Sequence, residues 1–581
     1  MELQILDADY VVIQNKPIIR LFCKNEKGET ICVFYDKFLP YFYVHAEDDK
    51  YPAITEEIKR KFDIVGTEVV EKKIPIGYQP PVKVLKVITK TPNQVRDMRD
   101  FVKQFGTPYE ADILFRYRFM SDFGLKGMGW INVEGTSTRT NTVKCKAIKA
   151  DKITPIERMT NAPLRYMGLD IECLSTGERI PTPEKDNIIM VSLAFNPTYK
   201  GKSDLVIISK SGKTNGNTIM CNSEEEMLGK LKEVIDEYDP DIMCGHNING
   251  FDIPFLLKRM EMLNVRKDMG RSEKLSNSRK LSHSYIPSIS GRIVIDTFEV
   301  YKRDPWVKFK RYDLNTIAMN MLGEGKIEME GNFLAYIKNV WSGNDFRELV
   351  DYARKDAILT LRLVVEKRLL NKFFEIAKLS GLLLQDTFGG QSQRHERRLL
   401  EEFYKRDFIM PCKPGDENVA GRHGLKGALV LEPEIGFHEW VVCLDFTSMY
   451  PSLISAFNIC TTTFLTNGDD VEHFVSPYGT KFVKPKVFRG IIPEIVDEVM
   501  AARKEVKQKY KKETDEEMRR ILEAKQLALK DLLNSLYGYT GYARSRLYVM
   551  DIANTITAFG RETITKTREL IEKNFNVKVI Y

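Results

Sequence analysis

The chain has 581 residues, enough for about four domains, and its 43% hydrophobic and 29% charged residues exclude a largely disordered or collagen-like protein. The formal net charge is +7, from 88 Lys and Arg against 81 Asp and Glu, which excludes a histone-like polycation and predicts only a local basic surface. The sequence has no run of about 18 apolar residues, so no membrane span is predicted, and its N-terminal residues do not resemble a secretory signal. The nine cysteines are scattered and form no Cys-x-x-Cys pair, which fits a protein of the reducing cytoplasm.

Residues 1 to about 135 are expected to form a small domain rich in strands. Alternating and β-branched residues predict strands at 10–13, 17–23, 31–35 and 82–88. A helix is predicted over 93–105, with Thr91 as its N-cap. The polar, basic residues 136–160 are interpreted as a linker.

The next part of the chain, up to about residue 365, alternates strands with helices. Strands are predicted at 166–173, 188–196, 205–209 and 241–244. An amphipathic helix is predicted over 224–238, where apolar residues recur every three or four positions. This alternation indicates an α/β domain.

Helices are expected to dominate the rest of the chain. A helix-rich stretch runs to about 410, a short strand is predicted at 441–444, and two long helices between 492 and 537 are separated by a polar turn near 513–515. The last residues, 577–581, are predicted to form an apolar strand.

A pair of acids ends the first strand of the α/β domain. Asp170 and Glu172 are two residues apart, so on a strand both side chains project to the same face. Adjacent carboxylates repel each other unless a cation lies between them, and oxygen ligands of this kind suit Mg²⁺ or Mn²⁺. A solvated strand end is the common alternative for this pair alone.

Three further polar residues follow in the same domain. Asp252 lies just beyond the strand at 241–244, and Tyr352 and Asp356 share one face of a helix at the i, i+4 spacing. Four acids and one phenol would complete a two-metal phosphodiesterase site in which Tyr352 orients the attacking water.

This ordered set resembles the three motifs of the proofreading 3′–5′ exonucleases. The matching residues are Asp170, Glu172, Asn247, Phe251, Asp252, Tyr352 and Asp356. The resemblance implies that the four acids are metal ligands and that all four, together with Tyr352, are catalytic.

A second group of residues begins at the predicted strand 441–444. Asp445 would lie at the exit of this strand, followed by a sharp turn that Pro451 ends. Such an acid, next to exposed backbone amides, can hold a metal ion and a polyphosphate together. The ring of Tyr450 would lie beneath a sugar and exclude a 2′-hydroxyl, whereas the alternative is an ordinary strand and turn with a buried tyrosine.

The two long helices carry cations at regular spacing. Arg503 and Lys507 are four residues apart on the first helix, Lys530 and Asn534 are four apart on the second, and Tyr537 follows one turn later. Cations on facing helices form a clamp for a triphosphate, although a basic helix face is more commonly only solvated.

These segments resemble the first palm motif and the fingers motif of the family B DNA polymerases. The matching segments are Asp445-x-x-x-x-Tyr450-Pro451 and Lys530-x-x-x-Asn534-x-x-Tyr537. The resemblance implies that Asp445 is a catalytic metal ligand and that Tyr450 is the steric gate. It also implies that Arg503, Lys507 and Lys530 hold the triphosphate, with Asn534 and Tyr537 near the nascent base pair.

The resemblance spans essentially the whole chain and implies its domain organisation. The expected fold class is α/β and α+β, with a ribonuclease H-like exonuclease domain, a polymerase palm and two-helix fingers. The expected domains are an N-terminal domain at 1–157 completed by about 366–408, the exonuclease at 158–365, the palm at 409–490 and 541–581, and the fingers at 491–540. A thumb is not expected among these residues.

The implied function is that of a DNA-directed DNA polymerase with 3′–5′ proofreading. It would use two Mg²⁺ or Mn²⁺ ions in each active site, act on primer–template DNA and dNTPs in the cytoplasm at the nucleoid, and bind a sliding clamp. Two alternatives are a stand-alone 3′–5′ DNA exonuclease with a vestigial palm and a non-enzymatic nucleic-acid-binding scaffold.

The N-terminal domain resembles that of the archaeal branch. Its segments 6–10, 38–41 and 91–99 are similar to those that form a pocket for template uracil in that branch. The residues carried over to this slot are Tyr10, Pro40, Pro92, Val95, Arg99 and Phe115. A narrow apolar slot would accept uracil and clash with the methyl group of thymine. The alternative is that these residues only shape a small β-domain.

Two departures from the family pattern stand out. The second palm motif, normally Tyr-Gly-Asp-Thr-Asp-Ser, would follow the predicted strand 577–581, so we expect the large part of a split or intein-interrupted enzyme. A separate C-terminal chain would then supply this hairpin and the thumb, with an engineered deletion as the alternative. Leu425-Lys426-Gly427-Ala428 replaces a Tyr-x-Gly-Gly/Ala loop, which predicts altered switching between polymerising and editing.

Overall fold

The computed structural model describes residues 1–581 except 176–178, 282–283, 305–306, 328–332, 416–423, 425 and 467–469. Leu425, in the segment that departs from the family pattern, therefore lies outside the described residues. No helix in the described part of the chain is both long and apolar enough to cross a membrane.

The N-terminal region contains a closed five-stranded barrel with the order β1-β2-β3-β9-β8. Its strands are β1 (Glu2–Ile13), β2 (Lys16–Lys24), β3 (Thr30–Tyr35), β8 (Trp130–Thr138) and β9 (Lys146–Ile156). The predicted strands 10–13, 17–23 and 31–35 lie within β1, β2 and β3.

The prediction of a linker at 136–160 is wrong, because β9 closes the barrel between β3 and β8. Ala147, Ala150 and Ile153 of β9 are buried, whereas its three lysines are exposed. Because the buried residues of β9 are few and mostly small and its exposed residues are mostly lysines, the sequence pattern of a strand is weak here.

A second, four-stranded sheet has the order β5-β6-β4-β7 and packs against two helices. Its elements are β4 (Tyr41–His45), α1 (Tyr51–Lys61), β5 (Ile64–Lys72), β6 (Val82–Thr89), α2 (Pro92–Val102) and β7 (Thr107–Tyr109). The predicted strand 82–88 is β6, and the predicted helix 93–105 is α2, which ends at Val102. Helix α3 (Phe115–Asp122) connects this sheet to β8.

The α/β domain is built on a six-stranded sheet with the order β13-β12-β11-β10-β14-β17. The strands are β10 (Tyr166–Leu174), β11 (Asn187–Tyr199), β12 (Lys202–Ile208), β13 (Thr218–Met220), β14 (Ile242–Gly245) and β17 (Ile293–Asp296). Strand β10 pairs with β11 in antiparallel and with β14 in parallel orientation. The acid pair therefore lies at the centre of the sheet.

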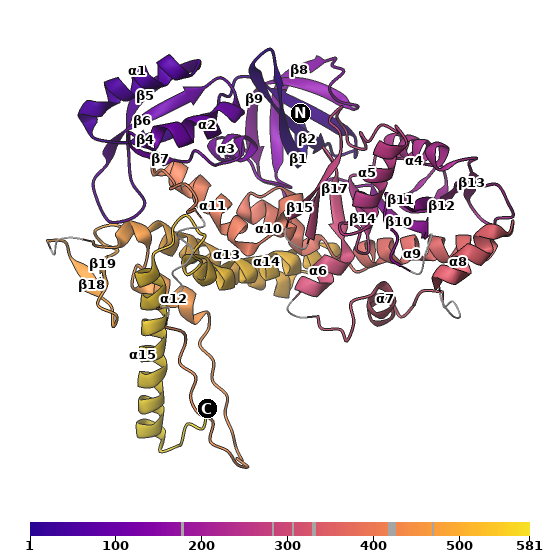
Figure 1. Ribbon diagram of the computed structural model, residues 1–581. Coiled ribbons are helices and arrows are strands. Elements are labelled where there is room, and N and C mark those ends of the chain that lie inside the picture. Colours follow the sequence, from indigo (N-terminus) through magenta and orange to yellow (C-terminus); the bar gives the residue numbers. More distant parts are fainter. Residues whose placement is uncertain are drawn as a thin grey trace.

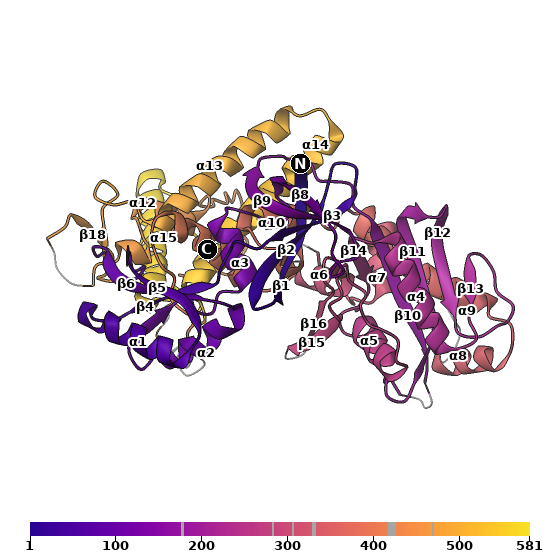
Figure 2. The ribbon, with the colours of Figure 1, turned by 90° about the horizontal axis from the view of Figure 1, so that it is seen from above.

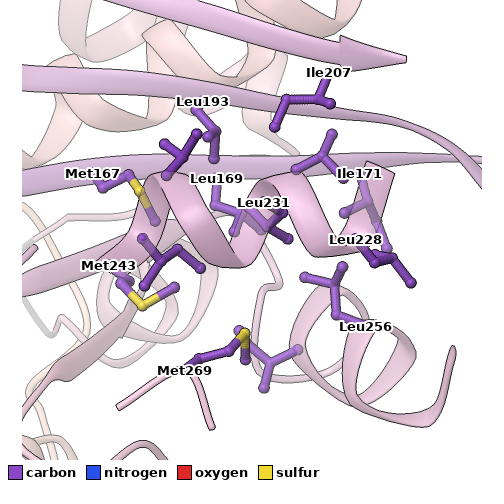
Figure 3. Packing of buried hydrophobic residues seen from close by; sticks show 14 of the residues in the cluster. Met167, Leu169, Ile171, Leu193, Ile207, Leu228, Leu231, Met243, Leu256 and Met269 are labelled. Carbon is purple, nitrogen blue, oxygen red and sulfur yellow. The ribbon is translucent and has the colours of Figure 1, made fainter. Parts of the chain in front are cut away.

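Helices cover both faces of this sheet. Helices α4 (Glu224–Tyr238) and α5 (Asp252–Met262) pack on one face, where Leu228, Leu231 and Leu256 meet Leu169 and Met243 (Figure 3). Helix α9 (Arg347–Val365) packs on the other face against β10 and β11.

The remaining elements of this domain surround the sheet. They are the hairpin β15 (Asn277–Leu281) and β16 (Ser284–Ser288), and helices α6 (Thr297–Arg303), α7 (Leu314–Leu322) and α8 (Phe333–Ser342).

Helices α10 (Asn371–Ser380) and α11 (Gln391–Lys405) connect this domain to a long helical pair, α13 (Ile491–Lys512) and α14 (Glu516–Thr540). Helix α14 packs against both α10 and α11, and the pair projects from the molecule in the view of Figure 2. The predicted pair of helices with a turn near 513–515 is thus confirmed.

The region predicted to be the palm contains α12 (Met449–Ala456), the hairpin β18 (His473–Val475) and β19 (Lys481–Val483), and α15 (Met550–Phe575). The strands predicted at 441–444 and 577–581 are wrong, because both segments are extended coil. Residues 577–581 follow the exposed end of α15 (Figure 1), and a backbone hydrogen bond from Glu434 N to Ile580 O (2.9 Å) connects them to the coil that precedes 441–444. A strand needs a ladder of such bonds, which these segments do not form with other described residues.

Candidate active sites

A compact group of carboxylates lies between β10 and α9. Oxygen atoms of Asp170, Glu172 and Asp356 all lie within 4.8 Å of one another. Glu172 and Asp356 are buried, with 7% and 4% of their surface exposed. Oδ1 of Asp356 is buried without a hydrogen-bond partner. Three oxygen donors with an unsatisfied lone pair fit a divalent metal ion such as Mg²⁺ or Mn²⁺.

Burial, together with electrostatic repulsion within this group, raises the pKa of Asp170 and Glu172. Burial, followed by the charge of Asp356, raises the pKa of Glu172 to about 8. Burial and the three neighbouring acids raise the pKa of Asp170 well above its ordinary value. A bound cation would offset both effects, because it favours the charged carboxylates.

Asp252 stands beside this group but outside it. It is the first residue of α5, and its Oδ1 accepts a hydrogen bond from Ile171 N (3.1 Å) in β10. Burial raises its pKa to about 7, although backbone hydrogen bonds lower it. The structure therefore brings together three of the four predicted acids and holds the fourth against the backbone of β10 at Ile171.

The loop before Asp252 is held by an acid that the sequence did not single out. Asp296, at the end of β17, accepts hydrogen bonds from Asn247 N (2.9 Å) and Asn249 N (3.1 Å). Gly250 lies in the same loop, where a Cβ atom would come within 2.5 Å of Asn247 Oδ1, so a larger residue would displace the Asn247 side chain. The only signal of Asp296 in the sequence is its position at the end of a strand, next to β14.

Lys326 is a second residue that the sequence analysis missed. Its Nζ lies 2.5 Å from Asp356 Oδ2 and 4.7 Å from the ring centroid of Tyr352. Burial lowers the pKa of Lys326, but the charges of Asp356 and Tyr352 outweigh this and raise it. Lys326 lies between α7 and α8, with no periodic relation to α9, so no sequence pattern connects it to the acids.

Tyr450 is the second residue of α12, and the centroid of its ring lies 4.6 Å from that of Tyr537 on α14, with a 33° angle between the planes. The structure thus brings these two predicted residues together. Asp445 is exposed on the coil before α12 rather than at the end of a strand.

The predicted triphosphate-binding residues are distributed over the helical pair. Arg503 and Lys507 belong to α13, and Lys530 and Asn534 belong to α14. The two helices pack through the buried residues Val506, Leu522 and Leu529. Lys507 and Asn534 are exposed, whereas Arg503 and Lys530 are half-buried.

The predicted uracil slot is brought together only in part. Tyr10 meets Phe115 edge-on with ring centroids 5.4 Å apart, and Pro40 O accepts a hydrogen bond from Thr89 N (2.9 Å), just before Pro92 at the start of α2. The side chains of two other predicted members are engaged elsewhere. Val95 packs against the core under α2, and Arg99 Nε binds Asp100 Oδ1 (3.1 Å).

Comparisons with known proteins identify the family of this chain. Residues 383–580 match the sequence profile of DNA polymerase family B, and residues 106–317 match that of its exonuclease domain. The chain is 33% identical to a DNA polymerase of Archaeoglobus fulgidus, over 99% of this chain and 69% of the relative. It is 29% identical to the DNA polymerase delta catalytic subunit of Bos taurus, over 97% of this chain and 56% of the relative.

The structure is also similar to a solved one, the family B DNA polymerase of Pyrobaculum calidifontis. The TM-score is 0.81 at 25% identity, and the match covers 100% of this chain and 77% of the other. The chain spans little more than half the length of the delta catalytic subunits that it matches. The sequence profiles, the Archaeoglobus relative and the shared fold together show that this chain belongs to DNA polymerase family B.

Proposed function

We propose that this chain carries the exonuclease, palm and fingers of a DNA-directed DNA polymerase with 3′–5′ proofreading. The observation that carries the proposal is the buried group of Asp170, Glu172 and Asp356 in a chain of this family. Primer–template DNA and dNTPs are the proposed substrates, with a sliding clamp as a further partner at the nucleoid.

The exonuclease is the activity we propose for these 581 residues alone. Asp170, Glu172 and Asp356 would hold metal ions that activate water and stabilise the leaving oxygen, with Asp252 as the fourth acid beside them. The hydroxyl of Tyr352 would orient the water. The ammonium group of Lys326, next to Asp356, would attract the phosphate that is cleaved.

Digestion of labelled single-stranded DNA in the presence of Mg²⁺ tests the exonuclease. The wild-type chain should shorten the strand from its 3′ end, and Asp170→Ala should abolish this digestion. Asp345→Ala is a matched control, because Asp345 is an acid of the same domain that pairs with Arg347 on the surface. Absence of digestion by the wild type would contradict the proposal and favour a nucleic-acid-binding scaffold.

For polymerisation, we propose that Tyr450 excludes ribose and that Arg503, Lys507 and Lys530 neutralise the triphosphate. Asn534 and Tyr537 would lie near the nascent base pair. Asp445 would be one metal ligand of the palm. A second palm acid is needed, because one carboxylate cannot hold two divalent ions well.

An exposed apolar surface supports the view that this palm is completed by further polypeptide. Ile435 and Trp440 are 98% and 97% exposed, and Val442 and Leu444 are 77% and 71% exposed. Exposed apolar residues gathered in this way mark a surface that another protein segment covers. We infer that this segment carries the second palm motif and the thumb, either joined to this chain or docked as a separate one.

Complementation tests this part of the proposal. The chain is mixed with a fragment of a near relative that begins at the second palm motif, and primer extension is measured. Extension should require both parts and should be lost in Asp445→Ala. If extension is absent although the two parts bind each other, the proposal for the palm is wrong.

We also propose that the slot at Tyr10 and Phe115 binds uracil in the template strand. The edge-on contact of these two rings, with centroids 5.4 Å apart, supports the proposal, because both belong to the predicted slot. Single-stranded DNA with one uracil should bind more tightly than the same strand with thymine, and Phe115→Ala should remove the difference. Equal affinities for both strands would contradict a uracil sensor.

A further inference from the structure

Tyr450 lies between two helices that come from distant parts of the chain. One face of its ring meets Tyr537 on α14. Its edge faces Gly560 on α15, where a Cβ atom would lie 3.0 Å from Tyr450 Cε1 and 3.8 Å from Cδ1. Gly560 is buried, and because it has no side chain the Tyr450 ring packs directly against the backbone of α15.

The backbone does not explain a glycine at this position. Gly560 lies in the interior of α15, where alanine would be the more stable helix former. Its φ is not in the left-handed region that favours glycine. The remaining reason is space, which is limited mainly by the edge of the Tyr450 ring, since the other neighbour, Met449 Cε, would lie at an ordinary contact distance of 3.5 Å from the added Cβ atom.

A shift of α12 or α15 cannot easily relieve the crowding that a larger residue at position 560 would cause. Phe559, next to Gly560, stacks on Phe457 at the end of α12, with ring centroids 3.9 Å apart and planes within 12°. This contact joins α15 to the helix that carries Tyr450. A contact of 3.0 Å must therefore be relieved by the ring itself, and Tyr537 restricts its movement on one face.

We propose that Gly560 is a positioning residue that determines the distance between the Tyr450 ring and α15. Through this distance it determines how strictly the site excludes ribonucleoside triphosphates. This inference rests on the proposed polymerase function, in which Tyr450 is the gate below the sugar. A methyl group at Gly560 pushes the ring away from α15 and narrows the space for a 2′-hydroxyl.

A stability measurement on this chain alone tests the contact. Gly560→Ala should lower Tm in the presence of Tyr450, because the new methyl group crowds the ring. In the Tyr450→Ala background the same substitution should raise Tm, because the crowding is gone and alanine favours the helix. Gly229→Ala in α4, with no atom within 4 Å of its new methyl group, should raise Tm in both backgrounds. An equal change in Tm on Gly560→Ala in the two backgrounds would show that the Tyr450 ring does not crowd position 560.

Primer extension by the completed polymerase tests sugar selection. Gly560→Ala should lower the ratio of kcat/KM for ribonucleotides to that for deoxyribonucleotides by about tenfold, because a methyl-sized change in a snug pocket has effects of this order. The substitution should leave the ratio unchanged in the Tyr450→Ala background. An unchanged or raised ratio with Tyr450 present overturns the role of Gly560. Failure of the wild type to extend a primer overturns the proposed function instead, and is seen without any substitution at Gly560.

Discussion

The ammonium group of Lys326 lies 2.5 Å from Oδ2 of Asp356, inside the group of acids between β10 and α9. This lysine comes from the segment between α7 and α8, whereas the acids come from the sheet and from α9. It supplies positive charge where three carboxylate oxygens already lie within 4.8 Å of one another. Without a metal ion, Lys326 therefore offsets part of the repulsion among these acids.

Lys326→Met should destabilise the metal-free chain by about 1–3 kcal/mol, because it leaves the buried Asp356 without its ion pair. The increase in Tm on addition of Mg²⁺ should then be larger than in the wild type, since the ion replaces the lost charge. Thermal unfolding with EDTA and with Mg²⁺ measures both effects. Lys355→Met is a matched control, because Lys355 pairs with Glu324 outside the acid group. An Mg²⁺-induced Tm increase no larger than that of the wild type would contradict the prediction.

The metal-free chain should lose stability as the pH rises from about 5 to 8. The pKa values of Glu172 and Asp252 are raised in the folded state to about 8 and about 7. In this range the folded chain binds more protons than the unfolded chain, so the free energy of unfolding falls with increasing pH.

Thermal unfolding across this pH range measures the effect. Mg²⁺ should reduce the pH dependence, because it binds the charged carboxylates, and Glu172→Gln should reduce it without metal. Asp345→Asn should leave it unchanged, since that exposed acid has a pKa lowered to about 2 by Arg347. A Tm that rises from pH 5 to 8 without metal would rule out this explanation.

Asp296→Ala should slow the exonuclease although Asp296 is not in the acid group. The substitution leaves the amides of Asn247 and Asn249 without their acceptor, and these amides hold the loop that leads to Asp252. The expected loss of stability is about 1–3 kcal/mol, together with slower digestion at saturating DNA.

Asp313→Ala separates a loss of stability from a loss of activity. Asp313 caps α7 by accepting a hydrogen bond from Thr316 N (2.9 Å), so its removal costs about 1 kcal/mol. It should leave digestion unchanged at a temperature where both variants are folded. Equal rates for the two variants would show that the loop does not depend on Asp296.

Backbone amides of residues 439–446 should exchange rapidly in this chain. The segment is exposed coil, and amides without stable hydrogen bonds exchange without unfolding of the domain. When the segment that carries the second palm motif is supplied, these amides should become protected, because 441–444 can then pair in a sheet. Buried residues 552–560 of α15 should be protected in both states, which provides an internal control. Rapid exchange at 439–446 in a complex shown to have formed would contradict the proposed completion of the palm.

Strong local periodicity explains which elements could be predicted. The helix at 224–238 and the helical pair with its turn near 513–515 were predicted correctly, because apolar spacing and turn residues act within a few residues. Strand β9 was missed because only three of its eleven residues, all small or medium in size, are buried. The strand at 441–444 was predicted from its apolar residues, but its formation depends on a partner strand.

The sequence by itself determined the order of the acids, the face that Asp170 shares with Glu172, and the spacing of Tyr352 and Asp356 on one helix. These follow from the two-residue and 3.6-residue repeats of strands and helices. Only the tertiary structure decided that Lys326 enters the acid group, that Asp252 binds the backbone of β10, and that Gly560 lies against the ring of Tyr450. Such contacts join residues tens to more than a hundred positions apart, and they depend on how whole elements pack rather than on any local repeat.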